Sequence, residues 1–217
     1  MKKQGIFFIT IGIVLIFFLT GCYVFHQVGW MDSLVLQFLE MIRSDTMHSI
    51  MLFFTNVFYG PIYFLLISIV VIWLWITKHR KEAFYFVLVL ILGNLLILGM
   101  KQLFLRDRPA LPLIPIDGYS FPSAHTYNAV IFYGFLLYLV KRYISVKSLR
   151  YLISIVLVFF IILTAISRLY LQVHYFTDII GGFALGFLTF GIFLLIVDKE
   201  KSKLVTSSGD GKSDLSW

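Results

Sequence analysis

The sequence predicts an all-α integral membrane protein: a bundle of six transmembrane helices, with one more helix lying at the membrane interface between the first two. Of the 217 residues, 60% are hydrophobic and only 13% are charged. The apolar residues are gathered in long runs, and a run of about 20 apolar residues spans a bilayer as a helix. Open sheets leave unpaired backbone groups in lipid, so helices are the expected element.

The six predicted spans follow one another along the chain. They are Gly5–Gln27, Pro61–Thr77, Glu82–Met100, Ser123–Val140, Leu149–Ile166 and Tyr175–Val197. The first span also resembles a bacterial lipoprotein signal, because Leu19-Thr20-Gly21-Cys22 follows a basic start and an apolar stretch. We interpret it as a membrane helix, since the later spans make an export signal redundant. The alternative, processing at Cys22, stays open on the sequence alone.

The connection between the first two spans contains an amphipathic stretch. Helical spacing gives it an apolar face and a polar face, formed respectively by Met31, Leu34, Val35, Phe38 and Ile42 and by Asp32, Ser33, Gln37 and Glu40. This pattern predicts a helix lying in the membrane interface. The segment Met47–Tyr59 is too short to span and is expected to pack against the bundle. Residues 1–198 are expected to form the membrane domain, and the polar tail 199–217 to be disordered.

The 18 Lys and Arg residues are divided unequally between the two sides that this topology creates. Thirteen fall on the side of both termini, and the other side has five, namely Arg43, Lys101, Arg106, Arg108 and Arg168. Positive residues favour the cytoplasm, so both termini of this multi-pass plasma-membrane protein are predicted to be cytoplasmic. The net charge of +7 does not indicate nucleic-acid binding, because no basic–aromatic groove or zinc-finger spacing accompanies it. The lone Cys22 excludes a disulfide framework and a cysteine metal site.

The stretch KQLFLRDRP contains three of the five cations on the side opposite the termini. Lys101 and Arg108 are seven residues apart, so on a continued helix they would share a face, about 10 Å apart along the axis. Pro109 would end that helix. We interpret Arg106 as a side chain that snorkels at the membrane boundary, with Asp107 as its local partner.

Two further stretches on this side, FPSAH and SRLYLQVHYFTD, carry two histidines. Ser123 can cap the fourth helix, whose first N–H groups are then free to bind an anion, and His125 falls in that first turn. His174 and Asp178 are four residues apart, so the carboxylate can reach the imidazole and fix one ring nitrogen as a donor. Arg168 lies at the outer end of the fifth span.

Each stretch alone is explained by ordinary structure: a helix cap, a boundary His–Asp pair, or snorkelling cations. Together they bring three cations, two histidines, a hydroxyl and a helix N-terminus to one side of the bundle. Guanidinium groups and helix N-termini bind phosphate. A histidine oriented by a carboxylate suits a nucleophile, and a second histidine can protonate a leaving oxygen. The pattern therefore indicates phosphoryl transfer; a protein that only binds or moves anionic lipids would leave the histidines idle.

The three stretches resemble, in the same order, the signature motifs of the type 2 phosphatidic acid phosphatase family: Lys101-x6-Arg108-Pro109, Pro122-Ser123-Ala124-His125 and Ser167-Arg168-x5-His174-x3-Asp178. The resemblance extends from about the first span to Val197. Ala124 departs from it, because the family usually has Gly at that place. The departure concerns only a backbone conformation with positive φ, since Ala124 still has an N–H to donate.

The resemblance implies a role for each of these residues. His174 attacks phosphorus and becomes a phosphohistidine, Asp178 holds its tautomer, and His125 protonates the departing lipid alkoxide and then activates water. The phosphoryl oxygens are held by Lys101, Arg108, Ser123, Ala124 and Arg168. Fixed cations can do here what Mg²⁺ does in kinases, so we expect a metal-independent enzyme without a cofactor.

The expected substrate is a membrane lipid phosphate, whose tails enter between helices while its headgroup meets the basic residues. We favour phosphatidylglycerophosphate, hydrolysed to phosphatidylglycerol; undecaprenyl pyrophosphate and phosphatidate are the alternatives. The expected partners are this lipid and the bilayer, with no nucleic acid and no obligatory protein partner. The site is expected to face away from the cytoplasm.

Overall fold

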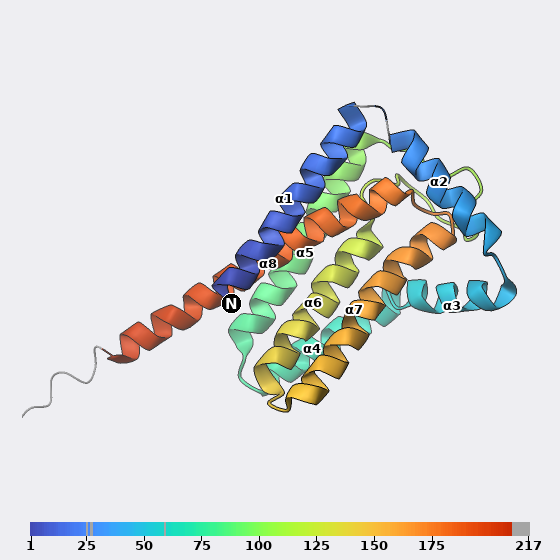
Figure 1. The fold of residues 1–217 in the computed structure, drawn as a ribbon. Coiled ribbons are helices and arrows are strands. Elements are labelled where there is room, and N and C mark those ends of the chain that lie inside the picture. Colours follow the sequence, from blue (N-terminus) through green and yellow to red (C-terminus); the bar gives the residue numbers. More distant parts are fainter. Residues whose placement is uncertain (25, 27, 59, 210–217) are drawn as a thin grey trace, which may run out of the picture.

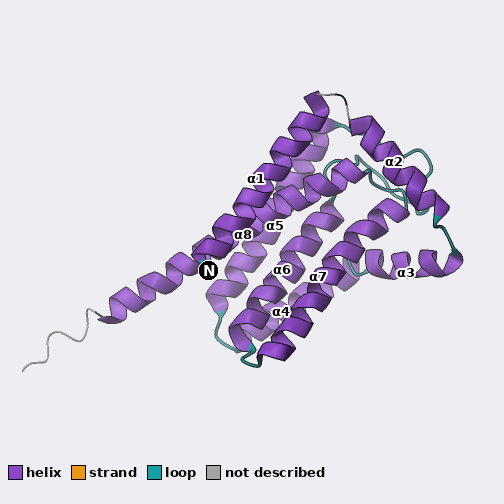
Figure 2. Cartoon of the chain, in the orientation of Figure 1, coloured by secondary structure: helices purple, strands orange, loops and turns teal. Residues whose placement is uncertain are grey.

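The computed structural model describes the chain except for residues 25, 27, 59 and 210–217, and for 200–209 it describes the backbone alone. The described part contains eight helices, and none of its residues lies in a strand (Figure 1; Figure 2). In chain order the helices are α1 (Lys2–Val24), α2 (Val28–Met41), α3 (Asp45–Asn56), α4 (Gly60–Ile76), α5 (Arg80–Phe104), α6 (Ala124–Tyr143), α7 (Lys147–Tyr170) and α8 (Phe176–Gly209). The all-α prediction is confirmed.

Several of these helices can cross a membrane. Among the described residues, α1, α5, α7 and the part of α8 up to Lys199 are long and apolar enough, and α3 with α4 would add a fifth crossing as one bent span. α4 has only 17 residues, and α6 has His125, Thr126 and Asn128 in its first turns and basic residues in its last. The chain is therefore a multi-pass membrane protein, while the number of six spans stays a prediction.

Helix α6 lies between α5, α7 and α8 and forms the centre of the bundle (Figure 1). Every residue from 126 to 135 is buried, and Phe135 stacks on Phe86 of α5 with ring centroids 4.1 Å apart. The amides of Asn94 and Asn128 bind each other reciprocally across α5 and α6, at 2.9 and 3.1 Å. The amide of Asn128 in α6 is thus satisfied inside the protein, where lipid does not reach it.

The outer faces of the bundle are apolar. Phe17 of α1, Phe64 of α4 and Ile155 of α7 are 72%, 69% and 68% exposed. Apolar surface of this extent is unusual on a water-soluble protein, and it suits a protein surrounded by lipid tails. The inner face of α1 carries Gly12, where a Cβ would lie 2.8 Å from the carbonyl oxygen of Ala184, so the missing side chain lets α1 lie close against α8.

Helix α2 lies across the end of the bundle where α7 ends and α8 begins (Figure 1). The predicted amphipathic helix exists, and part of its polar face is turned towards the protein. Asp32 is 3% exposed and contacts α8, whereas Leu34 and Phe38 are 45% and 57% exposed. The next helix, α3, packs against α7 and buries Met51 and Phe54, as expected for this segment.

Most helix ends lie within a few residues of the predicted spans, and the largest difference is at the C-terminal end of α8. α1 ends at Val24, and Gln27 lies outside the described residues, as does Tyr59 before α4. The backbone of α8 is helical to Gly209, so the first part of the tail that was expected to be disordered continues the helix. Lys199, Glu200, Lys201 and Lys203 have good helix propensity and favour the first part of this extension. The rest of that tail, 210–217, lies outside the described residues.

Candidate active site

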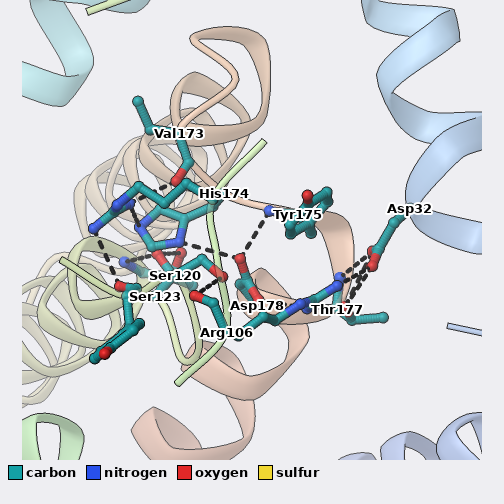
Figure 3. Close-up of polar contacts among 12 residues, drawn as sticks. Asp32, Arg106, Ser120, Ser123, Val173, His174, Tyr175, Thr177 and Asp178 are labelled. Atoms are coloured by element: carbon teal, nitrogen blue, oxygen red, sulfur yellow. Dashed lines mark hydrogen bonds and ion pairs between the residues drawn. The ribbon is translucent and has the colours of Figure 1, made fainter. Parts of the chain in front are cut away.

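The predicted site residues come together at one end of the bundle, where α5 and α7 end and α6 and α8 begin. His174 and Asp178 are held by the short connection between α7 and α8 and by the first turn of α8 (Figure 3). Their neighbours come from the long connection 105–123 that joins α5 to α6. The absence of a side chain at Gly182 allows this approach, because a Cβ there would lie 2.7 Å from the carbonyl oxygen of Ser123.

The contact between His174 and Asp178 that the spacing predicts is present. Nδ1 of His174 lies 3.3 Å from Oδ2 of Asp178, and the two side chains are 3% and 0% exposed. His174 precedes α8 and is not itself helical, so the carboxylate reaches back to it from the first turn. The same Oδ2 accepts a hydrogen bond from the backbone N–H of Tyr175 at 2.8 Å. A carboxylate at Nδ1 favours the tautomer that leaves a lone pair on Nε2.

Burial and charge both favour a neutral His174. Burial holds the pKa of His174 well below the ordinary histidine value, and the nearby cations Arg168, Arg108 and Lys101 lower it further, while the backbone of Ser120 acts in the opposite direction. A neutral imidazole has the lone pair that an attack on phosphorus requires.

Arg108 lies on the side of His174 that faces away from Asp178. Its Nη1 is 3.5 Å from Nε2 of His174 and donates to the carbonyl oxygen of Val173 at 2.6 Å. Its Nε donates to the carbonyl oxygen of Gly118 at 2.8 Å. Burial lowers the pKa of Arg108, while Asp178 and Asp117 act in the opposite direction. The guanidinium is therefore fixed beside the ring nitrogen that would meet a phosphoryl group.

The predicted continuous helix from Lys101 to Arg108 is not observed. α5 ends at Phe104, and Leu105 has a left-handed backbone with φ of 46°, so Arg108 lies in the following connection. The two cations still converge, because Lys101 Nζ and Arg108 Nη2 both donate to the carbonyl oxygen of Tyr119, the latter at 3.2 Å. The connection folds back on the helix end, which replaces the helical register as the reason for their proximity.

The start of α6 has the predicted cap. The hydroxyl oxygen of Ser123 accepts a bond from the backbone N–H of Thr126 at 3.4 Å, and the backbone N–H of Ser123 donates to the carbonyl oxygen of Asp178 at 3.0 Å. Ala124 is the first residue of the helix, and His125 follows in its first turn, partly exposed. His125 lies close enough to Arg168 for the charge of that guanidinium to act on it.

Arg168 is buried at the end of α7, with 2% of its surface exposed. Its Nη1 donates to the hydroxyl oxygen of Thr55 in α3, and its Nε has no hydrogen-bond partner among the described residues. Buried guanidinium groups are normally paired, so an unpaired N–H here is a donor available to a ligand oxygen. Thr55 was not among the predicted site residues, because it is a single hydroxyl more than 100 positions away in the sequence.

The prediction for Arg106 is wrong. Its ion pairs are not with Asp107 but with two residues distant in the sequence, Asp178 at 2.6 Å and Asp32 of α2. It also donates to the hydroxyl oxygen of Thr177 at 2.7 Å. The sequence held one unused signal, because Arg106 was among the five cations on the less basic side. The burial of Asp32 could not be predicted, because a residue on the polar face of an amphipathic helix is expected to face water.

A pocket of about 370 Å³ lies beside Arg106, and its lining residues are Gly29, Asp32, Ser33, Leu36, Arg106, Asp107 and Tyr175. Two carboxylates face this pocket, and its one arginine is already bound by Asp32 and Asp178. A phosphate would therefore meet net negative charge there. The cations beside His174 are the better phosphate site.

Among the described residues, no three His, Cys, Asp or Glu side chains come together in a metal-binding group. Metal independence itself stays a prediction, to be tested by chelation.

The sequence matches known proteins over most of its length. A family model described as the PAP2 superfamily matches residues 82–202. Phosphatidylglycerophosphatase B of Bacillus subtilis (strain 168) is 32% identical over 179 residues, which cover 79% of this chain and 85% of that protein. Lipid phosphate phosphatase delta of Arabidopsis thaliana is 34% identical over 83 residues, which cover 37% of this chain and 20% of that protein.

Two crystal structures resemble the fold. The structure of a transmembrane PAP2-type phosphatidylglycerolphosphate phosphatase from Bacillus subtilis matches with a TM-score of 0.77 and 26% identity, covering 87% of this chain and 96% of that one. LpxE of Aquifex aeolicus matches with a TM-score of 0.60 and 22% identity, covering 75% and 94%. At that identity the second match concerns the fold alone.

Proposed function

Because the chain belongs to the PAP2 superfamily and is similar to lipid phosphate phosphatases, we propose that it hydrolyses a membrane lipid phosphate through a phosphohistidine on His174. The observation that carries this proposal is the position of His174 between a carboxylate at Nδ1 and a guanidinium at Nε2. Asp178 holds the Nδ1–H, and Arg108 lies where an oxygen of the phosphoryl group would be held next to Nε2.

The proposed reaction has two displacements. In the first, Nε2 of His174 attacks phosphorus, the bond from phosphorus to the lipid oxygen breaks, and His125 gives its proton to the departing alkoxide. In the second, neutral His125 takes a proton from water, the water oxygen attacks phosphorus, and the bond to Nε2 breaks. Inorganic phosphate and the lipid alcohol are released, and both histidines return to their starting forms.

Charge on the phosphoryl oxygens is balanced by the protein itself in this proposal. Lys101, Arg108 and Arg168 donate to backbone carbonyls or a hydroxyl, and none of them takes part in an ion pair among the described residues. Their positive charge is therefore left for a phosphate. The capped start of α6, with the N–H groups of Ala124 and His125, adds a helix N-terminus.

The proposed substrate is phosphatidylglycerophosphate. This choice is supported by the similarity to phosphatidylglycerophosphatase B, which extends over 85% of that protein. The cations around His174 would suit the phosphate group of any of these lipids, so a polyprenyl pyrophosphate such as undecaprenyl pyrophosphate, and phosphatidate, are the alternatives. A protein that only binds anionic lipids is the alternative without catalysis.

Phosphate release by the purified protein in detergent, with EDTA present, tests the function. We expect release from phosphatidylglycerophosphate with a higher kcat/KM than from phosphatidate or undecaprenyl pyrophosphate, and inhibition by vanadate, which mimics five-coordinate phosphorus. Complete loss in EDTA that Mg²⁺ restores would contradict metal independence. Binding to anionic vesicles without phosphate release from any of the three lipids would favour the non-catalytic alternative.

We further propose that the site faces away from the cytoplasm, with both termini inside, as the unequal distribution of Lys and Arg indicates. Leu111, in the connection that carries Arg108, is 74% exposed. In a Cys22→Ser background, Leu111→Cys should react with a membrane-impermeant thiol reagent on intact cells. Ser145→Cys, in the exposed connection after α6, should react only after permeabilisation. The reverse pattern would overturn the proposed orientation.

A further inference from the structure

The two oxygens of Asp178 have separate partners. Oδ2 faces Nδ1 of His174 and accepts the backbone N–H of Tyr175, at 3.3 and 2.8 Å. Oδ1 accepts a hydrogen bond from Nη1 of Arg106 at 2.6 Å. The ion pair at Oδ1 thus fixes the rotation of the carboxylate about the Cβ–Cγ bond, with Oδ2 towards the imidazole (Figure 3).

Arg106 is itself held on several sides. Its Nη2 is bound by Asp32, its Nη1 also donates to Thr177 Oγ1 at 2.7 Å, and its guanidinium carbon lies 4.3 Å from the ring centroid of Tyr175. A planar guanidinium can bridge two carboxylates in fixed geometry, which a lysine cannot do. Figure 3 shows Arg106 between Asp178 on one side and Asp32 on the other.

Asp32 anchors this arrangement in a different helix. It lies in α2, is 3% exposed, and its Oδ1 accepts the backbone N–H of Thr177 at 2.9 Å, in the first turn of α8. One carboxylate therefore binds both the arginine and the start of the helix that carries Asp178. Helix α2 contains none of the three sequence motifs. Its Asp32 is nevertheless connected to His174 through the side chains of Arg106 and Asp178.

We propose that Arg106 and Asp32 form a positioning pair that orients Asp178 and keeps it ionised beside His174. This inference rests on the proposed role of His174 as nucleophile. Neither residue touches the phosphate in this proposal. The positive charge of Arg106 favours the ionised form of Asp178. Asp32 fixes the position of Arg106 and offsets part of its positive charge, so that the negative charge of Asp178 still stabilises the developing imidazolium.

The proposal predicts shifts of opposite sign in the acid limb of the pH dependence of kcat. Arg106→Gln removes a positive charge, so Asp178 and His174 both hold protons to higher pH. The acid limb should therefore move to higher pH. Asp32→Asn removes a negative charge and leaves the positive charge of Arg106 without its second carboxylate, so the acid limb should move to lower pH. The other charged or titratable groups that act on this pair stay in place in both variants: Lys101 of α5, Arg108 and Asp117 of the connection 105–123, His125 of α6, Arg168 of α7 and the adjacent Tyr175.

The same variants should separate kcat from KM. Misplacing a catalytic group by about 1 Å can cost on the order of 100-fold, so we expect Arg106→Gln to lower kcat by about 10- to 100-fold. KM should stay within about twofold, because the cations that hold phosphate are unchanged. Asp32→Asn should lower kcat by less, because Asn can still accept the N–H of Thr177. The kcat of Arg106→Lys should lie between those of wild type and Arg106→Gln, with little shift of the acid limb.

Two matched controls test whether the effects are specific. Asp107→Asn removes the same charge as Asp32→Asn from an exposed carboxylate beside Arg106, and Arg43→Gln removes a surface arginine that pairs only loosely with Glu40 at 3.9 Å. Both should keep the wild-type kcat and acid limb. The positioning pair would be refuted if Arg106→Gln and Asp32→Asn left the acid limb unmoved, or moved it in the same direction.

A measurement without turnover separates this inference from the proposed function. In ¹⁵N-histidine spectra of the protein in nanodiscs, assigned with His174→Ala, wild-type His174 should show a proton on Nδ1 alone. Arg106→Gln should give a mixture of tautomers, and Asp107→Asn should not. If wild type releases no lipid phosphate but these spectra change as expected, the proposed function fails and the positioning pair stands. If wild type turns over but the Arg106→Gln spectrum is unchanged, the positioning pair is wrong and the proposed function stands.

Discussion

The two ends of the helix bundle each carry an arginine, a carboxylate and a histidine in contact. At one end Arg106 pairs with Asp178, whose other oxygen faces His174 at 3.3 Å. At the other end Arg142, in the last turn of α6, pairs with Glu82 at the start of α5, and Nδ1 of His79 lies 3.9 Å from the same carboxylate.

The difference between the ends lies in burial and in the surrounding charge. The Asp178 and His174 side chains are 0% and 3% exposed, whereas those of Glu82 and His79 are 14% and 27% exposed. Around His174 there are also three cations that donate to carbonyl or hydroxyl oxygens: Lys101, Arg108 and Arg168. A His–carboxylate contact alone therefore does not indicate catalysis. Desolvation and a surplus of fixed positive charge distinguish the candidate site.

The largest effect should come from the two histidines that this comparison contrasts. His174→Ala should give no turnover and no phosphoenzyme, because it removes the nitrogen that forms the covalent bond. His79→Ala, the matched change at the opposite end, should keep the wild-type rate. Phosphate release and incorporation of ³²P from labelled substrate measure both. Near-normal turnover in His174→Ala would mean that the two ends do not differ in the proposed way.

A second prediction separates the two histidines of the site. With a lipid substrate, whose alkoxide is a poor leaving group, His125→Ala should be nearly as inactive as His174→Ala, with each lost proton transfer costing on the order of 10²- to 10⁴-fold. With an activated aryl phosphate the leaving group needs little protonation. Only the second step then needs a base, so acid-labile phosphohistidine should accumulate. Label on His125 itself, or steady turnover of the aryl phosphate without accumulation, would contradict the assigned roles.

Local sequence spacing predicted the local parts of the site. The Ser123 cap depends on residues three positions apart, and the His174–Asp178 contact on residues four apart, so a short stretch contains all the information. The apolar runs likewise predicted most helix positions to within a few residues, because the hydrocarbon core fixes their length. The ordered triple of motifs predicted the family, and that prediction is confirmed.

The partners of Arg106 could not be predicted in the same way. Asp32 and Asp178 lie 74 and 72 positions from it, so the pairing depends on how α2 crosses the end of the bundle. The end of α5 was also missed, because nothing in KQLFLRDRP excludes a further helical turn before Pro109. The sequence thus indicates which residues can do chemistry, but the packing of distant helices decides which of them meet.

The smallest effect should come from the arginine at the end opposite the site. Arg142→Gln removes the ion pair with Glu82 and the bond to the hydroxyl of the buried Tyr138. The Arg142 and Glu82 side chains are partly exposed, so water and salt compensate for most of the lost ion pair. We expect the free energy of unfolding to fall by about 1 kcal/mol or less, with kcat unchanged. Glu82→Gln should cost about the same, and the double variant little more than either, because both remove one interaction. Denaturant titration of the purified protein measures the stability, and phosphate release measures the rate. A loss of kcat in Arg142→Gln comparable to that in Arg106→Gln would show that the two ends are coupled, and that burial and surplus charge at the Arg106 end do not by themselves set the site apart.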